Sequence, residues 1–157
     1  MTIPTRRTRE GGFTLIEMLT VLVIFGISAA IAAPSLSGFI SGNKVDRARD
    51  QVIGDLAYSR MLAIRSAATV NVCLVNQTTY LIKRGASSVD CSGGTTVRTI
   101  RLGEDFPGVR IDETPPLVIT FNSRGLASVP PDQIDIVGPG GKSQAFTMSA
   151  IGTVFRK

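Results

Sequence analysis

Histidine and tryptophan are absent from the 157 residues of this chain, and cysteine occurs only twice. Without histidine, Ser-His-Asp and Cys-His catalysis, HExxH metalloenzymes and zinc sites that need imidazole are excluded. Two thiols are too few for a four-thiolate metal site. Aromatic residues make up 6% of the chain, too little for an obvious platform on which nucleic-acid bases could stack. We therefore expect no cofactor, and most enzyme classes are excluded before any motif is considered.

What is present is enough apolar sequence for one folded domain, together with an uneven basic charge. Hydrophobic residues make up 43% of the chain and charged residues 18%, so a core can be buried. The formal charge is +5, to which Arg6, Arg7 and Arg9 near the N-terminus contribute. A basic balance in a soluble protein would suggest nucleic acid or anionic lipid as a partner. Here the basic N-terminus flanks an apolar run, as the positive-inside bias predicts. The remaining charge is either ordinary surface charge or a dedicated binding face.

The apolar run extends from Phe13 to Ala33 and contains a single charge, Glu17. As a helix it would be roughly 30 Å long, the thickness of the hydrocarbon core of a bilayer. A secretory signal peptide is the alternative, because Ala30-Ile31-Ala32 could serve as a small-residue cleavage site. A carboxylate in hydrocarbon costs on the order of 3 kcal/mol, and an export signal has no use for it. We therefore predict a membrane-spanning helix in which Glu17 has a function.

The segment Gly12-Phe13-Thr14-Leu15-Ile16-Glu17 resembles the processing site of type IV pilins and type II secretion pseudopilins. The resemblance implies that a membrane aspartyl peptidase cuts after Gly12, where no side chain obstructs the bond, and that the new amine of Phe13 is N-methylated. Residues 1–12 would form a leader that stays in the cytoplasm until it is removed. In that family the carboxylate at the position of Glu17, the fifth residue of the mature chain, pairs with the terminal ammonium of a neighbouring subunit. Such a pair agrees with electrostatics, because a buried anion costs least where a cation meets it in low dielectric.

The helical pattern continues beyond the membrane segment, so we expect one bent helix over residues 13–66, roughly 80 Å long. Pro34, where the pilin family commonly carries a kink, interrupts the helix, and Gly38 and Gly42 loosen it. Apolar residues then recur at spacings of three, four and seven, which predicts a stripe packed on a globular domain. These residues are Val45, Val52, Ile53, Leu56, Met61 and Ile64. The arginines that we expect on a solvated face, or else on a DNA-binding stripe, are Arg47, Arg49, Arg60 and Arg65.

Over residues 67–157 the hydrophobic period changes to two, which predicts short β-strands. Turns rich in glycine and proline separate the strands without any helical pattern between them, and this spacing favours antiparallel sheets. The predicted fold is α+β: one long N-terminal helix, half transmembrane and half amphipathic, packed on a small antiparallel β domain. The expected strands lie around Val70–Leu74, Tyr80–Ile82, Thr96–Leu102, Leu117–Phe121, Gln133–Val137, Gln144–Met148 and Thr153–Phe155.

Cys73 lies in the first expected strand and Cys91 just before a glycine-rich turn. The apolar run places this domain outside the cytoplasm, where disulfides persist, so we predict a bridge between Cys73 and Cys91. Closing that loop would be worth roughly 3 kcal/mol on the chain-entropy estimate. Two free buried thiols are the alternative.

Beyond pilins in general, the chain resembles the GspH/FimT family of minor pilins and pseudopilins along essentially its whole length. The stretches that carry the resemblance are Ala57–Arg65 with Val70–Cys73, Ile119–Gly125 and Phe146–Lys157. The resemblance implies a helical spine with two β-sheets. Several members end in a Gly-Arg hairpin, where some DNA-binding relatives place arginines. In this chain Thr153 follows Gly152 and the basic groups come later, at Arg156 and Lys157, which argues against inherited DNA binding.

The resemblance implies a structural subunit rather than an enzyme. We expect a minor pilin that is cleaved and N-methylated by prepilin peptidase, joins a type IV pilus, and primes or caps its assembly. The chain would span the bacterial inner membrane once, with its C-terminal domain in the periplasm, before it enters the filament. The expected partners are other major and minor pilins or pseudopilins, the prepilin peptidase, the inner-membrane assembly platform and, before assembly, membrane lipid.

Two alternative functions stay open. One is a pseudopilin of a type II secretion system, although Pro34 and the cysteine pair look more like the fimbrial branch. The other is a minor pilin that captures DNA for natural transformation (competence), with scattered solvated cations as the competing interpretation. Its candidate DNA contacts are Arg98, Arg101, Arg124, Arg156 and Lys157.

An enzymatic interpretation has little support. Gly140-Gly141-Lys142-Ser143 resembles the end of a phosphate-binding loop, but Ile136 stands where the first glycine of that loop would be. The acidic pairs Glu104-Asp105 and Asp112-Glu113 have no metal-ligand spacing behind them, so we interpret them as solvated loops.

Overall fold

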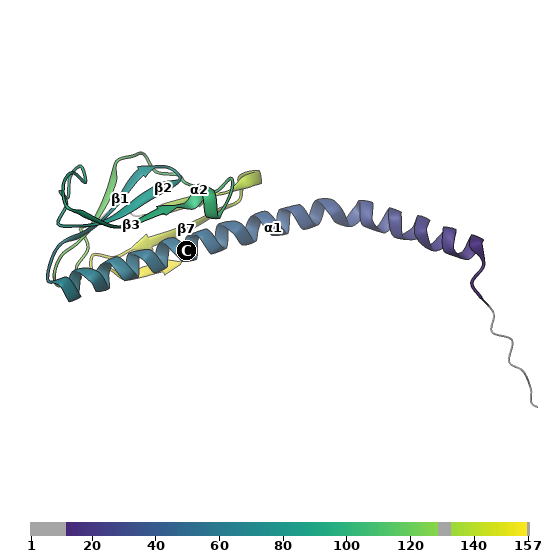
Figure 1. Cartoon of the computed structure of the whole chain (residues 1–157), viewed down its shortest axis with the longest axis horizontal. Coiled ribbons are helices and arrows are strands. Elements are labelled where there is room, and N and C mark those ends of the chain that lie inside the picture. Colours follow the sequence, from purple (N-terminus) through teal and green to yellow (C-terminus); the bar gives the residue numbers. More distant parts are fainter. Residues whose placement is uncertain (1–11, 129–132, 157) are drawn as a thin grey trace, which may run out of the picture. The chain divides into compact units, whose positions relative to one another are not determined.

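The computed structural model describes residues 12–128 and 133–156, and it leaves out the side chains of residues 33–37 and of Arg156. It divides into two units, the first ending at Ser37 and the second beginning at Gly38 (Figure 1). One helix, α1, runs from Leu15 to Ser66 and contributes to both. Its bounds agree with the helix expected from the sequence. The side chain of Pro34 is not among the described ones, so the kink expected at this residue stays a prediction.

In the first unit, α1 is apolar and exposed. Leu15–Ala32 is long and apolar enough to cross a membrane, and none of it is buried within the protein. Thr14 caps its start: the amide of Glu17 lies 3.3 Å from the Thr14 hydroxyl oxygen, which accepts its hydrogen bond. Farther along, the hydroxyls of Thr20 and Ser28 donate to backbone carbonyls four residues earlier. These local bonds satisfy the polar side chains inside an otherwise apolar segment.

In the second unit, α1 buries a narrow stripe rather than the broad apolar one expected from the sequence. Its buried apolar members are Val45, Ala48, Val52, Leu56 and Ala63. At 100° per residue, Met61 lies on the opposite side of the helix from this stripe, and 60% of it is exposed. Ile64 is half exposed as well. The prediction that Met61 and Ile64 belong to the stripe is therefore wrong, because small residues such as Ala48 and Ala63 occupy the buried side of the helix.

The first sheet contains four antiparallel strands in the order β3-β2-β1-β5. Val70, at the start of β1, lies opposite Arg84 of β2 and Phe121 of β5, so these three residues share one end of the sheet. Asn76, at the other end of β1, pairs with Thr79. The bounds are β1 Val70–Asn76, β2 Thr79–Arg84, β3 Thr95–Arg101 and β5 Leu117–Phe121.

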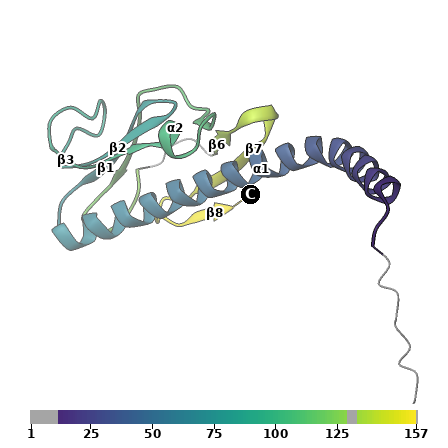
Figure 2. The same ribbon diagram turned by 45° about the vertical axis from the view of Figure 1, so that its right-hand side comes forward.

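The second sheet has the order β4-β6-β7-β8 and is also antiparallel. Figure 2 shows β7 and β8 of this sheet beside α1. The expected strands are confirmed, whereas β4 and the short helix α2 were not predicted. Elements of two and four residues are too short to show a period. The bounds are α2 Leu102–Asp105, β4 Arg110–Ile111, β6 Ile134–Val137, the 3-10 turn Pro139–Gly141, β7 Ser143–Met148 and β8 Val154–Arg156.

The core lies between the α1 stripe and the inner faces of the two sheets. Tyr80, Phe121 and Phe146 are its largest fully buried side chains. The β1 residues 70–74 are buried on both faces, which the alternating sequence pattern did not predict. Helix α1 covers one face of β1, and the loop after β2 is attached to the other face of β1. The predicted α+β fold with two antiparallel sheets is confirmed.

Candidate functional site

The predicted processing bond, between Gly12 and Phe13, lies outside regular structure. Both residues precede α1, and both are exposed. Apart from Gly12 itself and its chain neighbours, no described atom lies within 4 Å of the position that a Cβ on Gly12 would occupy. A peptidase needs an accessible, non-helical segment around the bond that it cuts, and the geometry here meets that requirement. Residues 1–11, the rest of the expected leader, lie outside the described residues.

Glu17 occupies the third position of α1, in its first turn. Its carboxylate is therefore close to the positive end of the helix dipole. The side chains around it, Leu15, Ile16 and Met18, are all exposed. An anion surrounded by exposed apolar residues is suited to burial against another helix that brings a cation. The role of Glu17 in assembly stays a prediction at this point.

A buried polar connection joins α1 to the first sheet. The Tyr80 hydroxyl of β2 donates to Oδ2 of Asp55 at 2.7 Å, and Nη1 of Arg98 on β3 donates to Oδ1 at 2.7 Å. Asp55 is 4% exposed. Burial, followed by the hydrogen bond to Asp55, raises the pKa of the Tyr80 hydroxyl far above its usual value. This connection was not predicted from the sequence. The feature that could have indicated it is Asp55 itself, a carboxylate three residues after Val52 at the edge of the buried stripe.

A second polar connection joins α1 to the other sheet. Arg49 donates from Nη1 to Oε1 of Gln144 on β7 at 2.9 Å. Its Nε and Nη2 donate to Oδ1 of Asp50 at 3.2 and 3.1 Å. Arg49 is 8% exposed, so the expectation that it lies on a solvated face is wrong. It lies about 50° from the centre of the buried stripe, and from there its guanidinium reaches the second sheet. Arg47 and Arg65 are exposed as expected, and Arg60 is half-buried.

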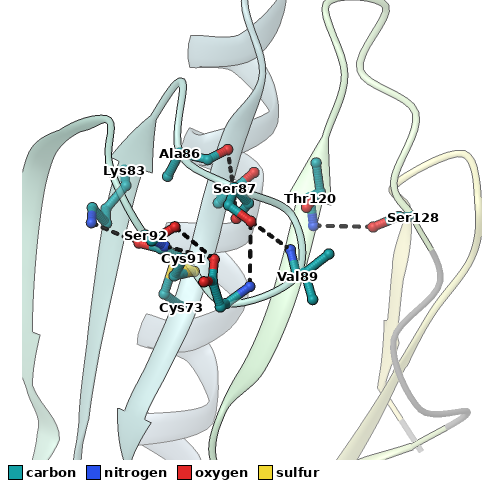
Figure 3. Close-up of a disulfide and its surroundings, with 11 residues drawn as sticks. Cys73, Lys83, Ala86, Ser87, Val89, Cys91, Ser92, Thr120 and Ser128 are labelled. Atoms are coloured by element: carbon teal, nitrogen blue, oxygen red, sulfur yellow. Dashed lines mark hydrogen bonds between the residues drawn. A yellow bond between two sulfur atoms is a disulfide. The ribbon is translucent and has the colours of Figure 1, made fainter.

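The predicted disulfide between Cys73 and Cys91 is present, with Cα atoms 6.1 Å apart (Figure 3). It fastens the loop after β2 to the outer face of β1. The Asn71 amide supports the same attachment by donating to the carbonyls of Ala86 and Ser87 at 2.9 and 2.7 Å. Nζ of Lys83 donates to the Cys91 carbonyl at 2.7 Å. The loop is therefore held by one covalent bond and by hydrogen bonds from two neighbouring strands.

Asp90 orders the tip of this loop. One of its carboxylate oxygens, Oδ1, accepts hydrogen bonds from the Ser92 amide at 3.0 Å and the Ser92 hydroxyl at 2.8 Å. Hydrogen bonding with Ser87 and with Ser92 lowers the pKa of Asp90 to about 2. The carboxylate is used to shape the turn.

Of the three candidate DNA contacts whose side chains are described, Arg98 and Arg101 lie together and Arg124 lies apart from them. Arg98 bonds to Asp55, although 55% of its side chain is exposed. Arg101 lines one hollow with Arg98, and its Nε lies 3.8 Å from Oε1 of Glu104. Arg124 follows β5, at the other edge of the sheet from β3. The Arg156 side chain and Lys157 lie outside the described residues. DNA binding stays a prediction that this arrangement does not favour.

Two family models match the sequence. Residues 7–33 match the prokaryotic N-terminal methylation motif, and residues 48–152 match the type II transport protein GspH. The first match includes the predicted processing bond and Glu17. The second covers more than half of the chain and includes both polar connections and the disulfide.

Curated relatives come from pili and from secretion systems. The chain is 26% identical to a type IV major fimbrial protein FimA of Dichelobacter nodosus over 133 residues, 82% of this chain and 81% of the relative. It is 48% identical to fimbrial protein Q of Moraxella bovis over 48 residues, 31% of this chain and 28% of that protein. It is 42% identical to type II secretion system core protein G of Klebsiella pneumoniae over 48 residues, 31% of each chain.

Among solved structures, the fold is similar to the crystal structure of the type IV minor pilin FimU of Pseudomonas aeruginosa. The TM-score is 0.59 at 15% sequence identity, covering 73% of this chain and 89% of that one. At this identity the similarity concerns the fold, a long helix packed on antiparallel strands.

Proposed function

Because this chain belongs to the GspH family of type II transport proteins, whose members are minor pilins and pseudopilins, we propose that it is a minor pilin of a type IV pilus. Members of this family assemble with other pilins or pseudopilins after processing by prepilin peptidase. In our proposal the peptidase cuts after Gly12, Phe13 is N-methylated, and the mature subunit primes or caps filament assembly.

The observation that carries the proposal is the coincidence of motif and geometry at the N-terminus. The methylation motif spans residues 7–33, and within it the Gly12–Phe13 bond is exposed and precedes α1. Glu17 follows in the first turn of an apolar helix that can span a membrane. We infer that its carboxylate pairs with the terminal ammonium of a neighbouring subunit, because an anion in hydrocarbon is stabilised most by a cation at short range.

The apolar helix and the family support an anchor in the bacterial inner membrane. We infer that the basic N-terminus stays on the cytoplasmic side, as the positive-inside bias favours, and that the C-terminal domain lies in the periplasm. The Cys73–Cys91 bridge supports this orientation, because disulfides persist in oxidising compartments. The proposed partners are other pilins, the prepilin peptidase and the inner-membrane assembly platform.

A pseudopilin of a type II secretion system is the second candidate, and the matches to core protein G favour it. Those matches cover about a third of each chain, whereas the match to the fimbrial protein FimA covers 81% of that protein. We therefore prefer a pilus.

The experiment that tests the proposal is to shear surface filaments from the native cells and to identify this chain in them by mass spectrometry. We expect a peptide that begins at N-methylated Phe13 in the sheared fraction. A mature chain confined to the membrane fraction would contradict the pilus and support the secretion pseudopilus. A chain that still begins at Met1 would contradict processing altogether.

A graded pair of variants tests the cleavage bond itself. Gly12→Ala should be processed slowly, and Gly12→Leu should leave full-length precursor in the membrane, because its side chain would obstruct the bond. Since the space around Gly12 is open within the described residues, neither change should disturb the fold. Normal maturation of Gly12→Leu, measured from the apparent mass on a gel, would show that the cleavage assignment is wrong.

A further inference from the structure

The two cysteines of the bridge differ in how accessible they are. Cys73 is 3% exposed in the middle of β1, whereas Cys91 is half-buried near the end of the loop between β2 and β3. Both cysteines line an open hollow of about 430 Å³ on the outer face of the first sheet. The other residues around this hollow include Val75, Leu81, Asp90, Pro116 and Val118. A molecule that enters from solvent therefore reaches the bridge, and it meets Cys91 first.

The loop that carries Cys91 has its own set of hydrogen bonds. The Ser87 amide donates to the Ser92 carbonyl at 2.9 Å, and the Cys91 amide donates to the Ser87 carbonyl at 3.2 Å. The Ser87 hydroxyl accepts a hydrogen bond from the Val89 amide at 3.2 Å. The Asp90 carboxylate accepts two more from Ser92. All of these bonds join residues of the loop to one another, so none of them needs the bridge in order to form.

Two neighbouring side chains hold this loop on the first sheet. Asn71 of β1 and Lys83 of β2 lie opposite each other in the strand pair. The fully buried Asn71 amide donates to two carbonyls at the start of the loop, at 2.9 and 2.7 Å. The Lys83 ammonium donates to the Cys91 carbonyl near the far end of the loop, at 2.7 Å (Figure 3). Asn71 is two residues before Cys73, on the same face of β1. Hydrogen bonds from the sheet therefore place the loop beside Cys73 independently of the bond between the sulfurs.

We propose that Cys91 is the thiol that first reacts with the oxidant that makes the bridge, that Asn71 and Lys83 position the reduced loop, and that Cys73 completes the reaction. The oxidant is a molecule that carries a reactive disulfide, either a small thiol compound or a protein. Exposure favours Cys91 as the first thiol to react, because access helps to decide which cysteine is attacked. The inference goes beyond the proposed pilin function, since it concerns how the domain matures before it meets another subunit.

The oxidation consists of two thiol–disulfide exchange steps. The Cys91 thiolate attacks one sulfur of the oxidant's disulfide, so a mixed disulfide forms and one oxidant thiolate leaves. The Cys73 thiolate then attacks Sγ of Cys91, which closes the bridge and releases the second oxidant thiolate. The chain loses two electrons and two protons, and the oxidant takes them up as two thiols. The second step is fast because Asn71 keeps the loop beside Cys73, and such positioning raises the effective concentration of the attacking group.

Trapping of the intermediate tests which cysteine reacts first. The full-length chain is reduced in detergent micelles, mixed with glutathione disulfide, quenched with acid at intervals, digested and analysed by mass spectrometry. We expect glutathione on the peptide that contains Cys91 and none on the peptide that contains Cys73. Glutathione on Cys73 would overturn the proposal.

Two single-cysteine variants measure the same difference as a rate. Cys73→Ser should react with glutathione disulfide at least about tenfold faster than Cys91→Ser, because the thiol that remains in Cys91→Ser is buried. The two rates should become equal in urea, where both thiols are exposed. Equal rates in the folded chains, or a difference that persists in urea, would overturn the proposal.

A matched pair of asparagine variants tests the positioning role of Asn71. Asn71→Ala removes two hydrogen bonds to the loop, whereas Asn76→Ala removes an exposed amide at the other end of the same strand. We expect the mixed disulfide at Cys91 to live about tenfold longer in Asn71→Ala and equally long in Asn76→Ala. A purely structural role of Asn71 would lower the melting temperature and leave this lifetime unchanged, and that result would overturn the positioning role.

Lys83→Met keeps the positioning role testable if Asn71→Ala does not fold. Lys83 is half-buried, and methionine retains much of its length while it removes the bond to the Cys91 carbonyl. The mixed disulfide at Cys91 should again live longer than in the unchanged chain. The same lifetime in both chains would contradict the proposal.

A comparison of two oxidants identifies the class of molecule that makes the bridge. At equal concentration, faster bridge formation with a protein disulfide oxidant than with glutathione disulfide assigns the oxidant to proteins, and the reverse order assigns it to small thiol compounds. With either oxidant the bridge should form more slowly in Asn71→Ala, and equal rates in the variant and the unchanged chain would overturn the proposal. None of these measurements involves cleavage or filaments, so a failure here leaves the pilin proposal unaffected.

Discussion

At the scale of single residues, the carboxylate of Asp55 has the largest structural role outside the N-terminal motif. It accepts hydrogen bonds from Tyr80 and Arg98, and it lies inside the protein. A buried carboxylate is tolerated when a cation and hydrogen bonds compensate for the lost hydration. One side chain of α1 thus fixes two strands of the first sheet to the helix.

We expect Asp55→Ala to lower the free energy of unfolding by about 3 kcal/mol, because the Tyr80 hydroxyl would stay buried without its acceptor. Denaturant unfolding of the full chain in micelles, followed by the near-ultraviolet signal of tyrosine, measures the change. The control Glu104→Ala removes an exposed ion pair with Arg101 and should cost less than about 1 kcal/mol. Equal losses in the two variants would contradict the compensating role of Asp55.

At the scale of elements, α1 and the disulfide loop decide how the sheets are held. Small residues on the buried stripe of α1 bring the helix close to the sheets. Asp55 attaches the helix to the first sheet, and Arg49 attaches it to the second. On the outer face of β1, the loop that contains Cys91 covers Asn71 and Cys73. Residues 70–74 of β1 are therefore buried on both faces, although their alternating sequence pattern is that of a strand with one solvated face.

Replacing both cysteines by alanine tests the contribution of the bridge. We expect the unfolding free energy to fall by about 3 kcal/mol, or about 10 °C in melting temperature, because the loop would no longer be closed in the unfolded chain. Thermal unfolding under oxidising conditions measures the change. Dithiothreitol should lower the melting temperature of the unchanged protein and leave that of the double variant where it is. An unchanged melting temperature in the double variant would mean that the bridge does not stabilise the domain.

The two neighbouring glycines at the end of this loop provide a matched comparison. Gly93 and Gly94 have φ angles of 68° and 65°, a region that costs other residues about 1 kcal/mol. A Cβ on Gly94 would lie 2.6 Å from the backbone nitrogen of Ala86, whereas a Cβ on Gly93 would meet no described atom within 4 Å. We expect Gly94→Ala to lower the melting temperature more than Gly93→Ala. The same loss from both would show that strain in φ, rather than the close approach of Ala86, requires glycine here.

At the scale of the whole molecule, the chain combines an apolar helical segment that is long enough to cross a membrane with a domain built from the rest of α1 and two antiparallel sheets. In our proposal, the apolar segment anchors the subunit in the bilayer before assembly and packs among other helices afterwards. Glu17 would then act within the helical part of the filament.

Glu17→Leu separates insertion from assembly. We expect the variant to insert well, because a leucine replaces a charge in hydrocarbon, and to enter filaments poorly, because the terminal ammonium of its neighbour loses its anion. The ratio of this chain in sheared filaments to that in membranes measures the effect. Ser28→Leu adds the same side chain to the same helix without removing a carboxylate, and its ratio should be unchanged. Equal ratios for Glu17→Leu and the unchanged chain would refute the pairing role.

The sequence by itself determined the features that depend on neighbours along the chain. The apolar run, the approximate extent of α1 and most strands follow from local periodicity and spacing. The disulfide could also be predicted, because a chain with two cysteines, in a domain expected outside the cytoplasm, allows a single intramolecular pairing. These features are predictable because each is specified within a short window or by a choice among very few partners.

Only the tertiary structure decided which distant residues meet. The burial of Arg49, the bonds of Arg98 to Asp55 and the exposure of Met61 depend on which angular face of α1 the sheets cover. The pairing of residues across neighbouring strands depends on strand register, which no local pattern specifies. The physical reason is that helix rotation and strand register are set by the packing of the whole core, where small differences in shape outweigh the hydrophobicity of single residues.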